Sequence, residues 1–344
     1  LSPHPYHVGN HQILTHSADS RSVVSVTLSL PRSMPESEGV DSAGVSEFVG
    51  ALESFGSVHS FMLVRHGFVV AERWWAPGAP DVASDVWSLS KSFSSTAVGI
   101  VIAEGRLTLT DRVVDLLPEE VPAEADERLA RLTVRHLLTM TTGHATESLT
   151  DDERLTESRW AQHILAQPLD FEPGTHFQYN SGATYLLSAI VQSVTGMPML
   201  EYLRPRLFGP LGIQNPTWLR SPQGVDAGGW GLSIRTEDIA KFGQLYLQRG
   251  QWSGASLIPS EWVAEATGRQ VSNGDPTEPD DWTQGYGYQF WRCRNGAYRG
   301  DGKLGQFCVV MPDQDAVLAL TGDVEDMSTE LNLVWEHLLP AFAH

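Results

Sequence analysis

The spacing of hydrophobic residues changes along the chain from helical to alternating and back. In residues 43–55 the apolar positions recur at helical spacing, which predicts a helix. Two β-rich runs within residues 61–72 then flank His66 and Gly67, which predicts a hairpin. Further upstream, the alternation in residues 24–28 is typical of an edge strand.

Residues 88–104 form the most unusual helix candidate. The first half has mostly small side chains and the second half is apolar, with Gly105 as a C-terminal stop. Asp85 or Ser84 is suited to cap the N-terminus. Because small side chains let a helix approach its neighbours closely, we expect this helix at the centre of the fold, packed on a sheet. The positive end of its dipole would then point into a cleft beside Ser88.

The middle of the chain has mainly helical patterns, and strands return near its end. Helical periodicity covers five central segments: 132–138, 160–165, 185–194, 236–247 and 261–266. β-rich runs follow at 288–291, 306–311 and 316–320, and a helix is predicted for 331–339. This order predicts a sheet domain built from residues 36–110 and 285–344, with a mostly helical domain, 111–284, inserted and a cleft at the junction. Residues 1–35 are interpreted as an N-terminal extension.

Composition restricts the classes of partner. The chain has 344 residues and a net charge of −19, which argues against nucleic acid or an anionic membrane surface as a partner. No apolar run approaches the length of a bilayer-spanning helix. A cytoplasmic location is the default expectation, and a removed signal peptide remains open as the alternative.

Cysteine and histidine usage gives no sign of a metal centre. Cys293 and Cys308 are too few for a disulfide framework, so two buried free thiols are expected, with a bond across a β-ribbon as the alternative. His7 and His11 stand four residues apart without the glutamate of an HExxH motif, and we interpret them as surface histidines. We therefore expect no metal, and the chemistry predicted below needs no organic cofactor.

The pair Ser88 and Lys91 carries the strongest chemical signal. The chain has only three lysines, Lys91, Lys241 and Lys303, and uses arginine for nearly every other positive charge. Arginine stays protonated, whereas a buried lysine can lose its proton and serve as a base. Residues three apart share a helix face, so the Ser88 hydroxyl can reach the Lys91 amine. Such a pair meets the basic requirement for an activated serine nucleophile.

Tyr179, in the run Phe-Gln-Tyr-Asn-Ser-Gly at 177–182, is the third catalytic candidate. A tyrosine at a loop-to-helix junction is commonly a core aromatic residue. Between a lysine ammonium and a serine, however, Tyr179 would lose its proton more readily, because positive charge favours the phenolate. It could then act as general base for the attack and general acid for the leaving group.

The order of these motifs resembles that of the serine β-lactamase and penicillin-binding-protein superfamily. Ser88-x-x-Lys91, Tyr179 before a leucine-rich helix, and a glycine-rich ribbon near the C-terminus follow the pattern of that superfamily. Six further segments are similar to its class C and family VIII carboxylesterase branch: 35–39, 107–111, 133–143, 173–175, 210–212 and 228–232. The resemblance covers residue 35 to the C-terminus. It implies an α/β (α+β) fold with an antiparallel sheet, flanking helices and an inserted, mostly helical domain.

The resemblance also implies roles for further residues. The backbone N–H groups of Ser88 and Gly302 would form an oxyanion hole. Arg299 stands at the usual cation position of the third motif and could hold a substrate carboxylate. Asp301 stands where glycine is usual, and would oppose developing negative charge unless it is paired or turned away. The other substrate-binding candidates are Ser181, which replaces the usual asparagine, Asn180, Trp87, Trp230 and Tyr286; for each tryptophan, core packing is the commoner role.

The sequence does not support a dinucleotide-binding site or an α/β-hydrolase nucleophile. Residues 300–305 fit the dinucleotide pattern G-x-G-x-x-G, but a β-rich run follows where a helix is required. No G-x-S-x-G nucleophile elbow occurs. The sequence therefore predicts a serine hydrolase that acts through an acyl-enzyme on a small-molecule ester or amide. An esterase ranks first, a D-amino-acid peptidase or amidase second and a β-lactamase third. The alternative of another class is a catalytically silent ligand-binding or scaffolding protein, and the oligomeric state is left open.

Overall fold

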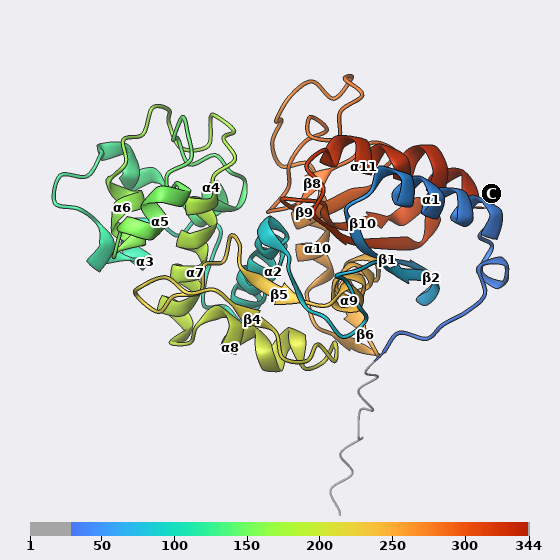
Figure 1. Ribbon diagram of the computed structural model, residues 1–344. Helices are drawn as coiled ribbons and strands as arrows, with labels where there is room; N and C mark the ends of the chain where they lie inside the picture. The colour runs from blue at the N-terminus through green and yellow to red at the C-terminus, as the bar shows by residue number, and fades with distance from the viewer. Residues whose placement is uncertain (1–28, 343–344) are drawn as a thin grey trace, which may run out of the picture.

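The computed structural model describes residues 29–342 (Figure 1). The strand predicted at 24–28 and the histidines His7 and His11 lie outside these residues.

A six-stranded antiparallel sheet joins the two ends of the described chain. Its strand order is β2-β1-β11-β10-β9-β8. The bounds are β1 Val58–Arg65, β2 Phe68–Trp74, β8 Trp291–Arg292, β9 Tyr298–Gly302, β10 Gln306–Met311 and β11 Ala316–Gly322. Because β1 pairs with β11, the early hairpin continues directly into the late strands. The mixed α/β fold predicted from the order of elements is confirmed.

The last strands differ from the prediction at one point. Residues 288–290 were expected to be extended, but β8 begins only at Trp291. Gln289 has a left-handed backbone (φ 64°), which interrupts an extended chain. Its buried side-chain amide donates to the carbonyl oxygens of Leu137 and Leu138 at 3.1 and 2.9 Å. Gln289 therefore joins the sheet to the helical half of the molecule.

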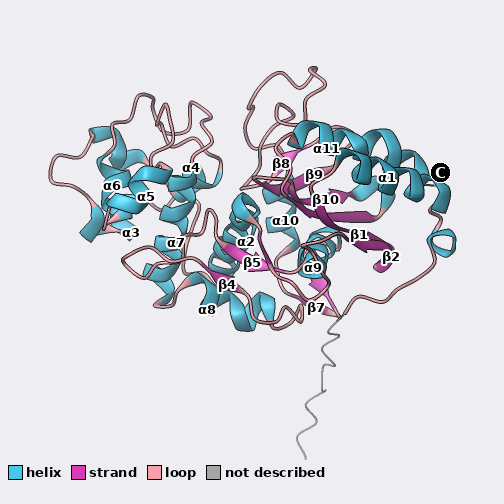
Figure 2. Cartoon of the chain, in the orientation of Figure 1, coloured by secondary structure: helices cyan, strands magenta, loops and turns pink. Residues whose placement is uncertain are grey.

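Helices cover both faces of the sheet (Figure 2). On one face lie α1, Ser42–Phe55, and α11, Met327–Leu333, which continues as a π-helical turn, Val334–Leu338. Their apolar side chains, among them Phe48, Leu52 and Leu338, form a core with Phe307 and Leu318 of the sheet. The other face carries α9, Thr236–Leu247, and the central helix α2, Ser90–Ala103.

Helix α9 was expected in the inserted helical segment, but the structure packs it on the sheet. Phe242 of α9 belongs to the same core as Val310 and Val317 of β10 and β11. A side chain at Gly243 would collide with Val317, so glycine is what lets α9 approach the strands this closely. Sequence position alone thus assigns α9 to the wrong neighbours.

The remaining helices gather around α7, Ser181–Thr195, on the other side of α2 (Figure 1). They are α3 Val113–Leu116, α4 Val134–Leu138, α5 Asp151–Thr156, α6 Trp160–Ala166 and α8 Met199–Leu203. Helix α10, Ser260–Thr267, lies near the sheet. A small sheet of β3 Ser84–Asp85, β5 Leu232–Ile234 and β4 Thr217–Trp218 stands beside α2, and β6 Gln251–Trp252 pairs with β7 Ala255–Ser256.

Two expectations about the whole chain can be compared with the described residues. Cys293 and Cys308 are both buried and free, as expected. Within residues 29–342 no single helix is long and apolar enough to cross a membrane. Only α7 taken together with the segment from Met199 to Phe208 passes that test, and this pair is bent by 66°.

Candidate active site

The candidate nucleophile lies where a short 3-10 turn, Trp87–Leu89, runs into α2. The turn is fixed at its start by Asp85, whose carboxylate accepts from the backbone N–H of Trp87 at 2.8 Å. Lys91, on the first turn of α2, donates from Nζ to Ser88 Oγ at 2.8 Å. The two side chains therefore meet in the way that their three-residue spacing predicts.

Lys91 is buried, with 1% of its surface exposed, and its hydrogen-bond partners are all uncharged. Besides Ser88, the Nζ donates to the carbonyl oxygen of Gly229 at 2.9 Å and to Ser181 Oγ at 3.1 Å. Desolvation lowers the pKa of Lys91 to about 7, and the nearby charge of Glu147 opposes this shift. A substantial fraction of the amine is therefore neutral near pH 7, which is the form that can accept a proton.

Tyr179 reaches the same point from the loop that precedes α7. Its phenol lies close enough to the Ser88 hydroxyl for that group to influence its pKa, and its ring centroid lies 4.8 Å from Lys91 Nζ. The expected stabilisation of a phenolate is wrong for this structure. Burial, reinforced by the negative charge of Asp301, raises the pKa of Tyr179 well above its usual value. A protonated Tyr179 can donate a proton, and Lys91 is the better candidate for the base.

Ser181 and Asn180 follow Tyr179 but face in different directions. Ser181 begins α7 and accepts from Lys91, so it occupies the polar contact expected of the usual asparagine. Asn180 is fully buried, and its side-chain oxygen accepts from Ala183 N and Ser148 Oγ at 3.3 and 2.9 Å. The substrate-binding role expected for Asn180 is therefore not supported, because its side chain caps α7.

Glu147 is a charged group at this site that no sequence motif predicts. Its carboxylate accepts from the backbone N–H groups of Ser181 and Gly182 at 2.7 and 2.9 Å. A carboxylate at the N-terminus of a helix is stabilised by the helix dipole. Glu147 thus fixes the start of α7, and with it Ser181 and Tyr179. No local pattern marks it, because it lies 34 residues before Ser181 in the chain.

Strand β9 places Gly302 beside the candidate nucleophile. A Cβ at Gly302 would collide with the carbonyl oxygen of Val86 and would lie 3.0 Å from Ser88 N. Only glycine permits the backbone of β9 to approach the 3-10 turn so closely. The amides of the two residues expected to form the oxyanion hole are therefore carried by backbone segments in contact.

Replacing Gly302 by alanine is expected to push β9 away from Ser88. Losing one oxyanion donor typically lowers kcat by about 10²-fold or more. We also expect a lower melting temperature, because the added methyl group meets rigid backbone. Gly50→Ala is the matched control: Gly50 lies in α1 with nothing within 4 Å, so activity should be unchanged and stability equal or higher. Wild-type kinetics in Gly302→Ala would contradict this role for β9.

Arg299 and Asp301 of β9 pair with each other. Arg299 is fully buried and donates from Nε to Asp301 Oδ2 at 2.9 Å, with a second contact from Nη1 to the carbonyl oxygen of Asp281. Its guanidinium also lies over the ring of Trp282. The expectation that Arg299 holds a substrate carboxylate is therefore not supported, because the group has no surface open to a ligand. An unpaired Asp301 would oppose the negative charge of an oxyanion. The ion pair with Arg299 offsets the charge of Asp301.

The three aromatic candidates lie around this centre in different settings. Tyr286 is 1% exposed and packs edge-on against Tyr179, with ring centroids 6.2 Å apart. Trp230 is buried next to Gly229 and stacks under the guanidinium of Arg154 at 3.7 Å. Trp87, adjacent to Ser88, is partly exposed. Trp87 is therefore the candidate best placed to touch a substrate, whereas Tyr286 and Trp230 are buried side chains that pack around the site.

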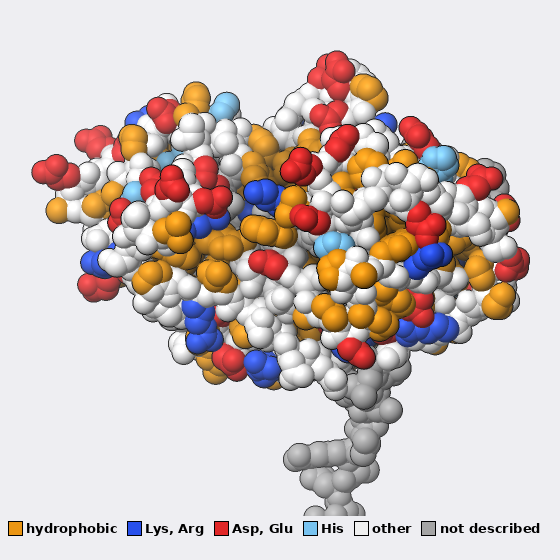
Figure 3. Space-filling view, viewed as in Figure 1, with side chains coloured by type: hydrophobic (Ala, Val, Ile, Leu, Met, Phe, Trp, Pro, Cys, Tyr) orange, Lys and Arg blue, Asp and Glu red, His pale blue; other side chains and the backbone are white. Residues whose placement is uncertain are grey.

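The face of the molecule in Figure 3 is hollowed between the helical half and the sheet half, and acidic side chains are spread over both. Within residues 29–342 no group of three or more His, Cys, Asp or Glu side chains is arranged to hold a metal ion. The described side chains offer chemistry by serine, lysine and tyrosine, and this fold and site define a serine hydrolase.

Comparison with known proteins gives the same class. The Beta-lactamase family profile matches residues 53–330, and the chain belongs to this family. It is 28% identical to 6-aminohexanoate-dimer hydrolase from Paenarthrobacter ureafaciens, over 78% of this chain and 74% of that protein. It is 30% identical to Esterase EstB from Burkholderia gladioli, over 46% of this chain and 44% of that protein.

The solved structures include a D-stereospecific amidohydrolase from Streptomyces with a TM-score of 0.69 at 18% identity. The match covers 87% of this chain and 99% of that one. At this level of identity the similarity shows the fold. The family match and the named relatives confirm the serine-hydrolase class, and the family match and the solved structures confirm the β-lactamase-like architecture.

Proposed function

We propose that this protein is a carboxylesterase of the β-lactamase family in which Ser88 is the nucleophile, Lys91 the base and Tyr179 the proton relay. The observation that carries the proposal is the buried Lys91 amine, which donates to Ser88 Oγ at 2.8 Å while its pKa is lowered to about 7. A lysine in this condition can take the serine proton at neutral pH.

The acylation step follows from the hydrogen bonds around Ser88. Neutral Lys91 accepts the proton of Ser88 as Oγ attacks the carbonyl carbon of an ester. The amides of Ser88 and Gly302 donate to the oxyanion of the tetrahedral intermediate. Tyr179, still protonated, donates its proton to the departing alkoxide and regains one from the Lys91 ammonium. The products of this step are the alcohol and an acyl-enzyme on Ser88.

Deacylation uses the same groups in reverse. Lys91, neutral again, removes a proton from water, either directly or through Tyr179, and the hydroxide attacks the acyl carbonyl. Collapse of the second intermediate returns the proton to Ser88 Oγ and releases the carboxylic acid. Both steps balance with the described side chains and water, so the proposal needs no metal or organic cofactor.

Amide hydrolysis is the second candidate, and one observation favours it. The chain is 28% identical, over most of its length, to a protein named for hydrolysis of the 6-aminohexanoate dimer, which is an amide. An amide nitrogen must be protonated to leave, and the high pKa of Tyr179 keeps a proton at the required place. The alkoxide of an ester is a better leaving group than the nitrogen of an amide, so we expect ester turnover to exceed amide turnover at the same site.

The proposal also covers the partners and the cellular location of the enzyme. A net charge of −19 favours a small neutral or cationic substrate over nucleic acid or an anionic membrane surface. A cytoplasmic location remains part of the proposal.

The pH dependence of ester hydrolysis tests this function. Because the neutral amine is the active form, kcat/KM should rise about tenfold per pH unit below the pKa of Lys91 and level off above about 7. Short-chain p-nitrophenyl esters, a D-amino-acid p-nitroanilide and a chromogenic cephalosporin, measured side by side, rank the substrate classes. No turnover of any of the three would favour the silent binding protein, and a rate independent of pH between 5 and 8 would exclude Lys91 as the base.

A further inference from the structure

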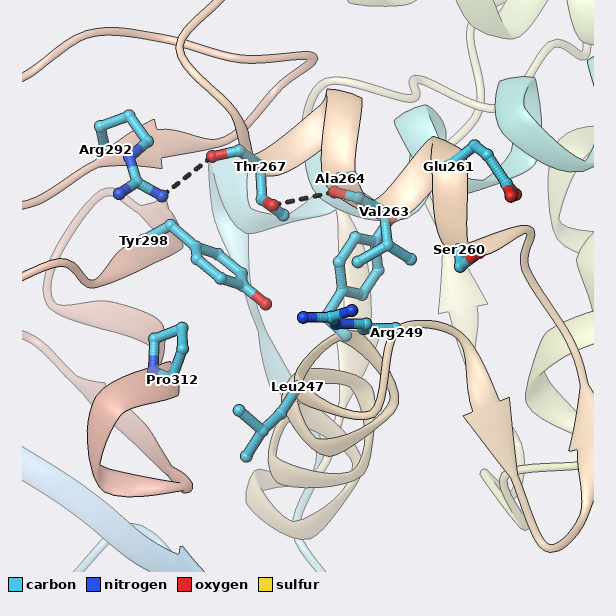
Figure 4. Close-up of a pocket in the computed structure, with 11 residues that line it drawn as sticks. Leu247, Arg249, Ser260, Glu261, Val263, Ala264, Thr267, Arg292, Tyr298 and Pro312 are labelled. Atoms are coloured by element: carbon cyan, nitrogen blue, oxygen red, sulfur yellow. Dashed lines mark hydrogen bonds between the residues drawn. The ribbon is translucent and has the colours of Figure 1, made fainter.

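A cavity away from the Ser88 site lies between the end of α9, α10 and strand β9 (Figure 4). Its volume is about 510 Å³, within the range of small-molecule sites. Leu247 and Arg249 line it from α9 and the turn that follows, Val263 from α10, and Tyr298 from β9. Ser88, Lys91 and Tyr179 are not among its lining residues.

Arg249 occupies an uncommon backbone position in this cavity. It follows the end of α9 with a left-handed conformation, φ 52°, and its N–H donates to the carbonyl oxygen of Tyr246 at 3.0 Å. Glycine or asparagine is usual at such a position, because other side chains strain the backbone there. Arg249 is exposed and lines the cavity, and residues with strained backbone are found more often than average at functional sites.

The two arginines that line the cavity, Arg249 and Arg292, form no ion pair with a carboxylate of the described residues. Within residues 29–342 Arg249 has no hydrogen bond or ion pair from its side chain. Arg292 donates only to two backbone carbonyl oxygens, those of Thr267 and Gly296, at 3.1 and 3.3 Å. Most other arginines of the described chain are paired with Asp or Glu. Glu261 also lines the cavity, but Figure 4 shows its carboxylate turned away from both arginines.

The remaining walls supply one more donor and an apolar surface. The Tyr298 hydroxyl points towards Arg249 in Figure 4 and has no hydrogen-bond partner in the described part of the chain. Burial raises the pKa of Tyr298, so this hydroxyl keeps its proton. Leu247, Val263 and Pro312 form the apolar part of the lining. A complementary ligand therefore has an anionic head and a short aliphatic chain.

We propose that this cavity binds a small organic anion, with a carboxylate or phosphate head on a short aliphatic chain. Arg249 binds the oxygens of the head, because a guanidinium group matches the planar spacing of carboxylate and phosphate oxygens. Arg292, held by the carbonyl oxygens of Thr267 and Gly296, adds positive charge to the wall. Tyr298 donates a further hydrogen bond. The chain lies against Leu247 and Val263. This site is independent of the function proposed for Ser88.

Calorimetric titration at low ionic strength tests the proposal, with butyrate and butyl phosphate as anions and butyramide as the neutral analogue. We expect saturable binding of at least one anion and none of butyramide. The comparison of the two anions identifies the preferred head group. Arg249→Gly should weaken anion binding by about tenfold or more, since it removes a charged donor. Its melting temperature should be equal to or above that of the wild type, because glycine suits the left-handed backbone.

Two matched variants distinguish loss of the Arg249 contact from the effects of relieving backbone strain or removing a positive charge elsewhere. Ser253→Gly relieves a left-handed residue in an exposed turn without changing charge, and Arg269→Gln removes an exposed arginine outside the cavity. Both should bind the anions as the wild type does. The proposal is overturned if neither anion binds saturably, if Arg249→Gly binds them equally well, or if butyramide binds as tightly as butyrate. Loss of binding in Arg249→Gly with normal ester turnover would leave the Ser88 proposal untouched.

Discussion

Ser88→Ala is expected to lower kcat for short-chain p-nitrophenyl esters by about 10⁴-fold or more, because it removes the hydroxyl that we propose forms the acyl-enzyme. The two groups that face Ser88 Oγ, the amine of Lys91 and the phenol of Tyr179, cannot replace it as a nucleophile that is regenerated by hydrolysis. The folded state should be unaffected, since the change removes one partly exposed hydroxyl.

Labelling with a fluorophosphonate, followed by peptide mapping, identifies the nucleophile directly. The wild type should carry the label on Ser88, and Ser88→Ala should carry none. Ser54→Ala is the matched control, because Ser54 is an exposed serine of α1 that bonds only to the carbonyl oxygen of Gly50. Its activity should equal that of the wild type. Modification of a different residue, or ester turnover that survives in Ser88→Ala, would refute the assignment of the nucleophile.

Lys91→Arg should lower kcat by about 10³-fold although it keeps a positive charge in the site. General-base catalysis contributes about 10²- to 10⁴-fold, and arginine does not lose its proton at accessible pH. The arginine must also fit where Lys91 donates to Ser88, Ser181 and Gly229. The rise of kcat/KM with pH around 7 should disappear, because the group that titrates there is gone.

Lys91→Met distinguishes the loss of the base from a failure to fold. Methionine resembles lysine in length and requires no desolvation of an amine, so thermal unfolding should occur at an equal or higher temperature than in the wild type. Its activity should be as low as that of Lys91→Arg. If Lys91→Arg kept most of the activity while Lys91→Met lost it, Lys91 would act only through its charge, and the base would have to be another group.

Local pattern was sufficient wherever neighbours in sequence are also neighbours in space. The hairpin of β1 and β2 turns at His66 and Gly67, both with positive φ, as the two-residue turn signal indicates. The hydrogen bond between Ser88 and Lys91 follows from helical spacing in the same way. In these cases backbone geometry over a few residues fixes the contact, so the sequence contains the information.

Pattern was insufficient wherever long-range packing decides the partner. Helical periodicity predicted α9 correctly but not its position, because Gly243 and Phe242 match the surface of β10 and β11. The motif position of Arg299 suggested a ligand contact, yet Asp301 and the carbonyl of Asp281 bind it in the interior. Glu147 became visible only when α7 was placed beside it.

The amino-acid sequence by itself determined the class of enzyme, the order of strands and helices, and the identity of the three candidate catalytic side chains. Spacing and residue type are enough for these features, because they depend on local backbone geometry and on the intrinsic chemistry of each group. The tertiary structure alone decided the protonation of the site. Burial lowers the pKa of Lys91 and raises that of Tyr179, so the lysine rather than the tyrosine is suited to be the base. Desolvation depends on every residue packed around a group, and those residues come from distant parts of the chain.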